Sequence, residues 1–173
     1  MNVFETACPI PADTDIDDVN FINHGGRAVI SRPGIHVSKI SLRLSLFTFE
    51  HMYCRVTSGG TSMILAVLYR PGSRPPTSEF FEELTKYVEL LSTFDLPITV
   101  TGDINIHFQN ADEAYTKRLN DLLQSFGLAR HVSLPTHDCG GILDVIITPI
   151  DRPQRPPELM TSTFRTTFCC PGM

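Results

Sequence analysis

The stretch that decides the fold is residues 98–107, which read ITVTGDINIH. A short apolar run with β-branched residues that stops at a glycine is typical of a buried strand. In extended backbone the side chains alternate, so Asp103, Asn105 and His107 are expected to share one face. On the same pattern Ile104 and Ile106 point the other way, into a core. The pattern therefore predicts a carboxylate and an amide together at the mouth of a sheet.

That pair has a chemical interpretation and a structural one. A carboxylate can orient or deprotonate a water and an amide can donate to a phosphate oxygen, which is what metal-assisted phosphoester hydrolysis requires of side chains. Asp and Asn are also common turn formers at the end of a strand. On these residues alone the turn interpretation is favoured, and the rest of the chain has to decide.

Composition predicts one soluble globular domain. The chain has 173 residues, of which 42% are apolar and 19% charged, and a net charge of -5 argues against holding nucleic acid by charge alone. The five cysteines lack paired metal-ligand spacing and no basic-then-apolar leader is present, which favours free thiols and a nuclear or cytoplasmic protein that is not secreted. The longest apolar run, residues 63–69, is far short of the roughly 20 residues of a membrane span, so no membrane partner is expected.

The first half of the chain predicts strands. Residues 3–6 resemble the end of a strand, and Glu5 within them could bind a hard cation such as Mg²⁺ or simply be solvated. Alternation over residues 35–40 predicts a half-buried strand, and residues 47–56 and 61–69 predict a hairpin that turns at Gly59-Gly60.

The second half predicts two helices and a further pair of strands. Helical spacing covers 77–91, with Thr77 or Ser78 as the cap and acids on a solvated face, and returns over 110–126 with Asn110 as the cap. Strands are expected at 128–134 and 142–147. Asp144 interrupts the second one, and since a buried charge is costly unless it is paired, a partner is expected at a strand mouth. A domain over residues 1–150 and an irregular tail over 151–173 are predicted.

Four short segments, taken in order, carry a resemblance: YRP at 69–71, GDINIH at 102–107, PTH at 135–137 and LDVIIT at 143–148. Together they resemble the endonuclease/exonuclease/phosphatase superfamily, and within it the apurinic-endonuclease-like domain of LINE-type (non-LTR) retrotransposons. The resemblance implies an α/β (α+β) fold, a four-layer sandwich of two mostly antiparallel sheets flanked by helices, incomplete here at both ends.

The resemblance also implies an activity, hydrolysis of a DNA phosphodiester with Mg²⁺ or Mn²⁺, and two partners, the target-site duplex and a reverse transcriptase domain in the full-length element. By motif, Asp103 corresponds to the carboxylate that orients or activates the attacking water, and Asn105 to the amide that holds the scissile phosphate. Tyr69 corresponds to a tyrosine that contacts the phosphate. Asp144 corresponds to the carboxylate that orients a catalytic histidine, and Glu5 to a metal-binding glutamate.

Two parts of the family pattern have no match in this sequence. An asparagine-bearing strand would lie before Met1, and no Asp-His pair occurs in residues 149–173. The histidines His107, His131 and His137 stand elsewhere and are interpreted as loop or surface residues. We therefore expect a nuclease fold with an incomplete catalytic set and impaired activity. Two alternatives stay open: a catalytically inactive remnant that acts at most as a binding module, and a phosphoesterase of the same superfamily.

Overall fold

The structure is a computed structural model that describes residues 2–7, 26–136 and 140–151, with side chains from residue 29 onward. Its described part contains a six-stranded sheet in the order β3-β4-β5-β6-β8-β7 and a two-stranded sheet of β1 and β2. The elements are β1 (Asn2–Ala7), β2 (Gly26–Ser31), β3 (His36–Ile40), β4 (Glu50–Ser58), β5 (Thr61–Tyr69), α2 (Ser78–Ser92), β6 (Ile98–Asp103), α3 (Ala114–Ser125), β7 (Leu128–Arg130) and β8 (Asp144–Pro149).

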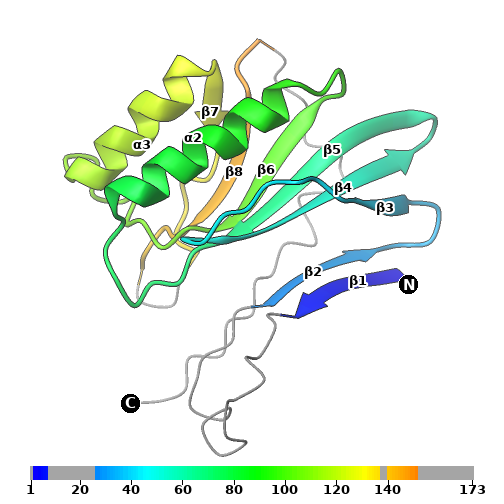
Figure 1. The fold of residues 1–173 in the computed structure, drawn as a ribbon, viewed down its shortest axis with the longest axis horizontal. Coiled ribbons are helices and arrows are strands. Elements are labelled where there is room, and N and C mark those ends of the chain that lie inside the picture. Colours follow the sequence, from blue (N-terminus) through cyan, green and yellow to red (C-terminus); the bar gives the residue numbers. More distant parts are fainter. Residues whose placement is uncertain (1, 8–25, 137–139, 152–173) are drawn as a thin grey trace, which may run out of the picture.

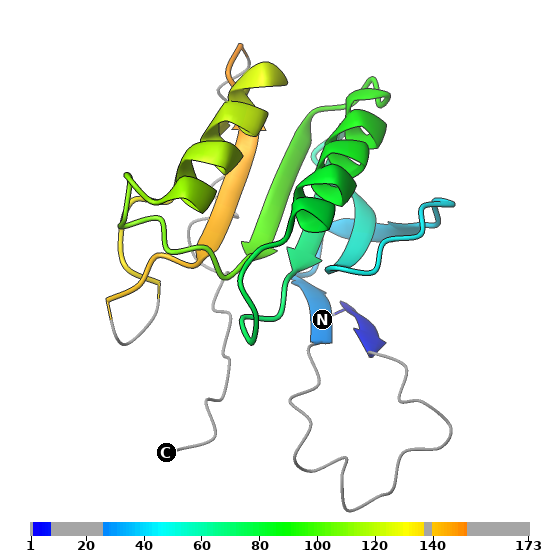
Figure 2. The same ribbon diagram turned by 60° about the vertical axis from the view of Figure 1, so that its left-hand side comes forward.

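The six-stranded sheet is antiparallel except where β5 lies parallel to β6. Parallel neighbours need a crossover connection, and α2 provides it. Both helices lie on the same face of the sheet (Figures 1 and 2). None of the described helices is long and apolar enough to cross a bilayer.

The main core lies between the helices and this sheet. Alternate residues of β5, Ile64 and Leu68 among them, face α2 and pack with its apolar stripe. Ile104 and Ile106, which follow β6, belong to the same core and are 1% and 2% exposed. The expectation that these two isoleucines point inward is confirmed.

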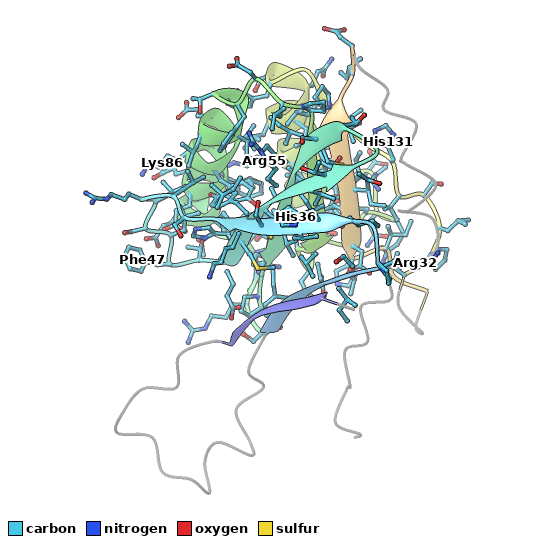
Figure 3. All side chains as sticks on the ribbon, turned by 90° about the vertical axis from the view of Figure 1, so that its right-hand side faces the viewer. Arg32, His36, Phe47, Arg55, Lys86 and His131 are labelled. Atoms are coloured by element: carbon cyan, nitrogen blue, oxygen red, sulfur yellow. The ribbon has the colours of Figure 1, made fainter. Side chains whose placement is uncertain are left out.

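A second, smaller core lies on the opposite face of the sheet. Val37, Met52, Cys54 and Leu65 form it, and Val29 of β2 packs against it. The small β1–β2 sheet therefore lies on the side away from the helices, next to β3 (Figures 1 and 3). Helices, a large sheet and a second sheet make up an α/β sandwich, which confirms the predicted fold class. The predicted tail falls almost entirely outside the described residues.

The first predicted helix is confirmed, whereas the start predicted for the second helix is wrong. Thr77 caps α2, its hydroxyl accepting from the Phe80 N–H at 3.2 Å. Asn110 does not cap α3, which begins only at Ala114. The Glu113 N–H donates to the Asn110 carbonyl at 3.1 Å, which closes a tight turn there instead of the first turn of an α-helix.

One acid of α2 is buried, against the expectation of a solvated face. Glu83 is 6% exposed and accepts from the Phe47 N–H at 3.0 Å, the Thr48 N–H at 2.9 Å and the Thr48 hydroxyl at 2.6 Å. The backbone N–H groups of Phe47 and Thr48 therefore donate to the Glu83 carboxylate and not to the carbonyls of a neighbouring strand. For that reason β4 begins at Glu50 and not at Phe47, whose ring is 85% exposed at the edge of the molecule (Figure 3).

Candidate active site

Four polar side chains form a row across the large sheet. Tyr69 at the end of β5 is the register partner of Glu50 on β4 and of Asp103 on β6, and Asp103 is in turn paired with Asp144 on β8. Paired residues of neighbouring strands point to the same face. Since Leu68 and Val145 beside them point to the helices, the row lies on the face away from the helices. Its strands are the β4–β5 hairpin and two strands from later in the sequence, β6 and β8.

The centre of the row is a pair of carboxylates. Asp103 is 7% exposed and Asp144 is half-buried, and they stand directly opposite each other on antiparallel strands. Side chains so placed have Cβ atoms about 4.5–5.5 Å apart, and like charges there destabilise a sheet. Two of the predicted site residues are therefore brought together at a cost in stability.

Tyr69 lies in the negative field of this row. Burial raises the pKa of the Tyr69 phenol above its usual value, and the carboxylates of Asp103 and Glu50 raise it further, while Arg70 acts in the opposite direction. The phenol consequently stays protonated and can donate a hydrogen bond. Glu50 was not predicted as a site residue, because its place opposite Tyr69 depends on the strand register.

Asn105 follows Asp103 in a left-handed turn with φ of 49°. Its N–H donates to Asp103 Oδ1 at 2.8 Å, and its side-chain Nδ2 donates to the Arg70 carbonyl at 2.7 Å. The predicted extended face ends here, because β6 stops at Asp103. His107 is exposed, with Nδ1 3.2 Å from Gln109 Nε2, so the expectation that it continues the face of Asp103 and Asn105 is wrong.

Arg70 holds this turn and was not predicted as a site residue. It is 5% exposed, and its guanidinium donates to the carbonyls of Ile104 at 2.7 Å, Asn105 at 2.6 Å, Arg74 at 2.8 Å and Pro71 at 3.1 Å. Burial lowers the pKa of Arg70, and the nearby Asp103 carboxylate acts against that shift. The only signal in the sequence was its place between Tyr69 and Pro71.

The loop before β8 fixes the start of the Asp144 strand. The Thr136 hydroxyl accepts from the Leu143 N–H at 3.1 Å and from the Asp144 N–H at 3.2 Å. The Ile104 N–H donates to the Leu143 carbonyl at 3.2 Å, which joins this loop to the one that follows Asp103. Thr136 of the PTH segment therefore holds the backbone at Asp144, the β8 residue of the row.

The remaining histidines lie away from the row or outside the described residues. His131 follows β7, is exposed, and has Nε2 2.7 Å from the Thr148 hydroxyl (Figure 3). Its assignment as a surface histidine is confirmed. His137 falls outside the described residues.

The prediction that the site binds Mg²⁺ is supported in part by the carboxylates that lie in the row. Asp103, Asp144 and Glu50 offer the oxygen ligands that Mg²⁺ prefers. Within the described residues, however, no three His, Cys, Asp or Glu side chains are placed to hold a metal ion. Glu5 pairs with Ala28 between β1 and β2, and its side chain lies outside the described part. The described side chains therefore do not complete a metal site.

Solved structures share this arrangement of strands and helices. The endonuclease domain of TRAS1, a telomere-specific non-LTR retrotransposon, matches with a TM-score of 0.61 at 15% identity, over 86% of this chain and 66% of that one. The human Nocturnin catalytic domain with bound sulfate anion matches with a TM-score of 0.57 at 16% identity, over 84% of this chain and 60% of that one. The chain has the endonuclease/exonuclease/phosphatase-type fold.

The chain spans 66% and 60% of the lengths of the two structures. No protein-family model matches the sequence, and no curated protein matches it. At these identities the likeness concerns the fold alone.

Proposed function

We propose that this chain is a metal-dependent DNA endonuclease domain of the non-LTR retrotransposon type, which hydrolyses a phosphodiester bond. The observation that carries the proposal is the direct pairing of Asp103 with Asp144, beside Tyr69 and ahead of Asn105. Facing carboxylates cost stability in a sheet, and acid–base sites are where such arrangements are found. The TRAS1 structure, which shares the fold, is an endonuclease domain of a non-LTR retrotransposon and supports this proposal.

Each side chain has a role in this reaction. Asp103 orients or deprotonates the attacking water. The protonated phenol of Tyr69 and the amide of Asn105 donate to the phosphate oxygens, on which charge builds during the displacement. Asp144 is the carboxylate available to orient a histidine. Because residues 149–173 contain no histidine, we expect slow turnover from this chain.

Mg²⁺ or Mn²⁺ is the proposed cofactor, and when bound it would neutralise charge on the phosphate. Glu5 is the proposed ligand, because glutamate supplies the oxygen atoms that a hard cation prefers. Within a complete element the domain would act with a reverse transcriptase on target DNA, in the nucleus or cytoplasm.

The test is nicking of a supercoiled plasmid by the purified chain in Mg²⁺, with a chelated reaction in parallel. We expect slow nicking that chelation abolishes. Loss of a positioned acid–base group costs about 10²–10⁴-fold in rate, so Asp103→Asn should fall by at least about 10²-fold. Asp95→Asn is the matched control, since it makes the same chemical change at an exposed position after α2.

Three other outcomes would contradict the proposal. Salt-sensitive DNA binding without nicking would identify a binding module. Cleavage of a small chromogenic phosphodiester without cleavage of DNA would identify a phosphoesterase with another substrate. Equal nicking by wild type and Asp103→Asn would remove Asp103 from the reaction.

A further inference from the structure

The guanidinium of Arg70 donates hydrogen bonds to main-chain carbonyls of the site. Buried arginines usually meet a carboxylate, whose geometry matches their planar fork. Arg70 instead donates to four carbonyls, those of Ile104 and Asn105 on one side and of Pro71 and Arg74 on the other. One side chain therefore ties the turn that follows β5 to the turn that follows β6.

The contacts of Arg70 fit the unusual backbone of Asn105. In extended backbone consecutive carbonyls point in opposite directions, so one guanidinium could not reach both Ile104 and Asn105. The left-handed φ of 49° at Asn105 brings the two carbonyls to the same side. Asparagine tolerates this region better than most residues, but it is still a sparsely populated conformation that its surroundings must hold.

The attachment is reciprocal. The Arg70 N–H donates to the Asp103 carbonyl at 2.9 Å, and the Arg70 carbonyl accepts from Asn105 Nδ2 at 2.7 Å. Asn105 N–H in turn donates to Asp103 Oδ1 at 2.8 Å. Arg70 is thus bonded to the backbone of Asp103 and to the side-chain amide of Asn105, and the Asn105 N–H holds the Asp103 carboxylate.

Gly72 supplies a second, independent observation. A Cβ at Gly72 would lie 2.7 Å from Asn105 Oδ1 and 2.8 Å from its Cγ. The turn over residues 70–74 is therefore packed directly against the Asn105 side chain, and a glycine leaves the room for it. The orientation of the Asn105 amide depends on this turn.

We propose that Arg70, together with the turn that it closes at Gly72, is a positioning residue that sets the left-handed backbone and the amide orientation of Asn105 beside Asp103. This inference rests on the proposed function for its catalytic consequence only. Lysine cannot replace Arg70, because a single ammonium lacks the rigid fork that reaches carbonyls on both sides.

The experiment compares Arg70→Lys with Arg74→Lys, the same exchange on an exposed side chain of the same turn. Two quantities are measured in the folded protein: the NMR signal of the Asn105 side-chain amide, assigned by its loss in Asn105→Asp, and hydrogen exchange of the amides at 104–106. In Arg70→Lys we expect the signal to shift and exchange to accelerate. In Arg74→Lys both should match wild type.

Steady-state nicking supplies a readout that a merely structural role would not move. Small misplacement of a reacting group costs about 10²-fold, so kcat of Arg70→Lys should fall by that order while KM stays close to wild type. A merely structural role would lower the melting temperature and leave kcat per folded molecule unchanged. That result, or an Asn105 signal unchanged from wild type, would overturn the inference.

Two further outcomes are also decisive. If Arg70→Lys fails to fold, Gly72→Ala keeps the guanidinium and displaces Asn105 directly, and the same NMR shift is required of it. If wild type shows no hydrolysis, the proposed function fails, whereas the NMR and exchange measurements still decide whether Arg70 positions Asn105.

Discussion

Gly102 is the residue whose replacement should damage the fold most directly at the site. It lies inside β6 with φ of 138°, a region essentially restricted to glycine. A Cβ there would lie 1.8 Å from the Leu68 carbonyl oxygen of β5. The obstructing atom belongs to the backbone of a central strand, so it cannot rotate away. Gly102→Ala must push β5 and β6 apart or distort one of them.

The expected cost follows from the distances. Ordinary contact begins at 3.4 Å, so the strands must separate by about 1.6 Å. That separation breaks the nearby bond from the Arg70 N–H to the Asp103 carbonyl, now 2.9 Å. A buried polar group left unpaired costs about 1–3 kcal/mol, and the backbone strain adds about 1–3 kcal/mol. We expect a loss of about 4 kcal/mol, a large part of the 5–15 kcal/mol typical of a domain.

The assay is urea unfolding followed by far-UV circular dichroism, since the chain contains no tryptophan. Gly60→Ala is the matched control: Gly60 also has a positive φ, 81°, but nothing lies within 4 Å of its added Cβ. Its free energy of unfolding should fall only by the strain of a left-handed alanine, about 1–2 kcal/mol. If the two variants lose the same free energy of unfolding, the contact with Leu68 does not explain the glycine.

Two further predictions concern the charged and polar groups described above. Burial tends to raise the pKa of Glu83, but hydrogen bonds from Thr48 and Phe47 outweigh that effect and lower it in the folded protein. The ionised Glu83 therefore stabilises the folded state, and this stabilisation is lost as the pH falls through the folded pKa. Glu83→Gln should therefore lose about 1.5–3 kcal/mol at neutral pH, and the difference from wild type should shrink below about pH 4 in urea titrations. A difference that stays constant with pH would exclude this role. At the site, Tyr69→Phe should lower the nicking rate on the order of 10²-fold. Burial raises the pKa of Tyr69, so in a pH–rate profile deprotonation of this phenol should lower the wild-type rate only above the usual tyrosine range. Unchanged nicking by Tyr69→Phe would contradict the hydrogen-bonding role.

Local patterns in the sequence predicted local structure well. The alternation around residues 98–107 placed Ile104 and Ile106 in the core, Gly59-Gly60 marked the hairpin turn, and Thr77 marked the start of α2. Each depends on neighbours within a few residues. The predicted start of α3 was wrong: residues 110–113 form a separate tight turn, which a capping pattern at Asn110 does not distinguish from the first turn of a helix.

The candidate site was predicted in part. Asp103, Asn105, Tyr69 and Asp144 were identified from their motifs, and the strand register shows that three of them stand in one row. Glu50 could not be added, because register between strands is a long-range property.

Arg70 and Glu83 were missed for a related reason. Their hydrogen-bond partners are largely main-chain groups, which every residue carries. A pattern of side chains in the sequence therefore cannot predict these contacts.

The glycines on either side of the row distinguish two ways in which the site can fail. At Gly102 an added methyl meets a backbone carbonyl that cannot yield, so the damage falls on stability and the site is lost with the fold. At Gly72 the methyl meets the far end of the Asn105 side chain, which can rotate, so the fold should survive while the amide moves. Gly72→Ala should therefore keep an unfolding free energy close to wild type and nick DNA more slowly than wild type. If both variants lost stability and activity in the same proportion, positioning of Asn105 would be inseparable from folding, and the role given to the turn at 70–74 would be wrong.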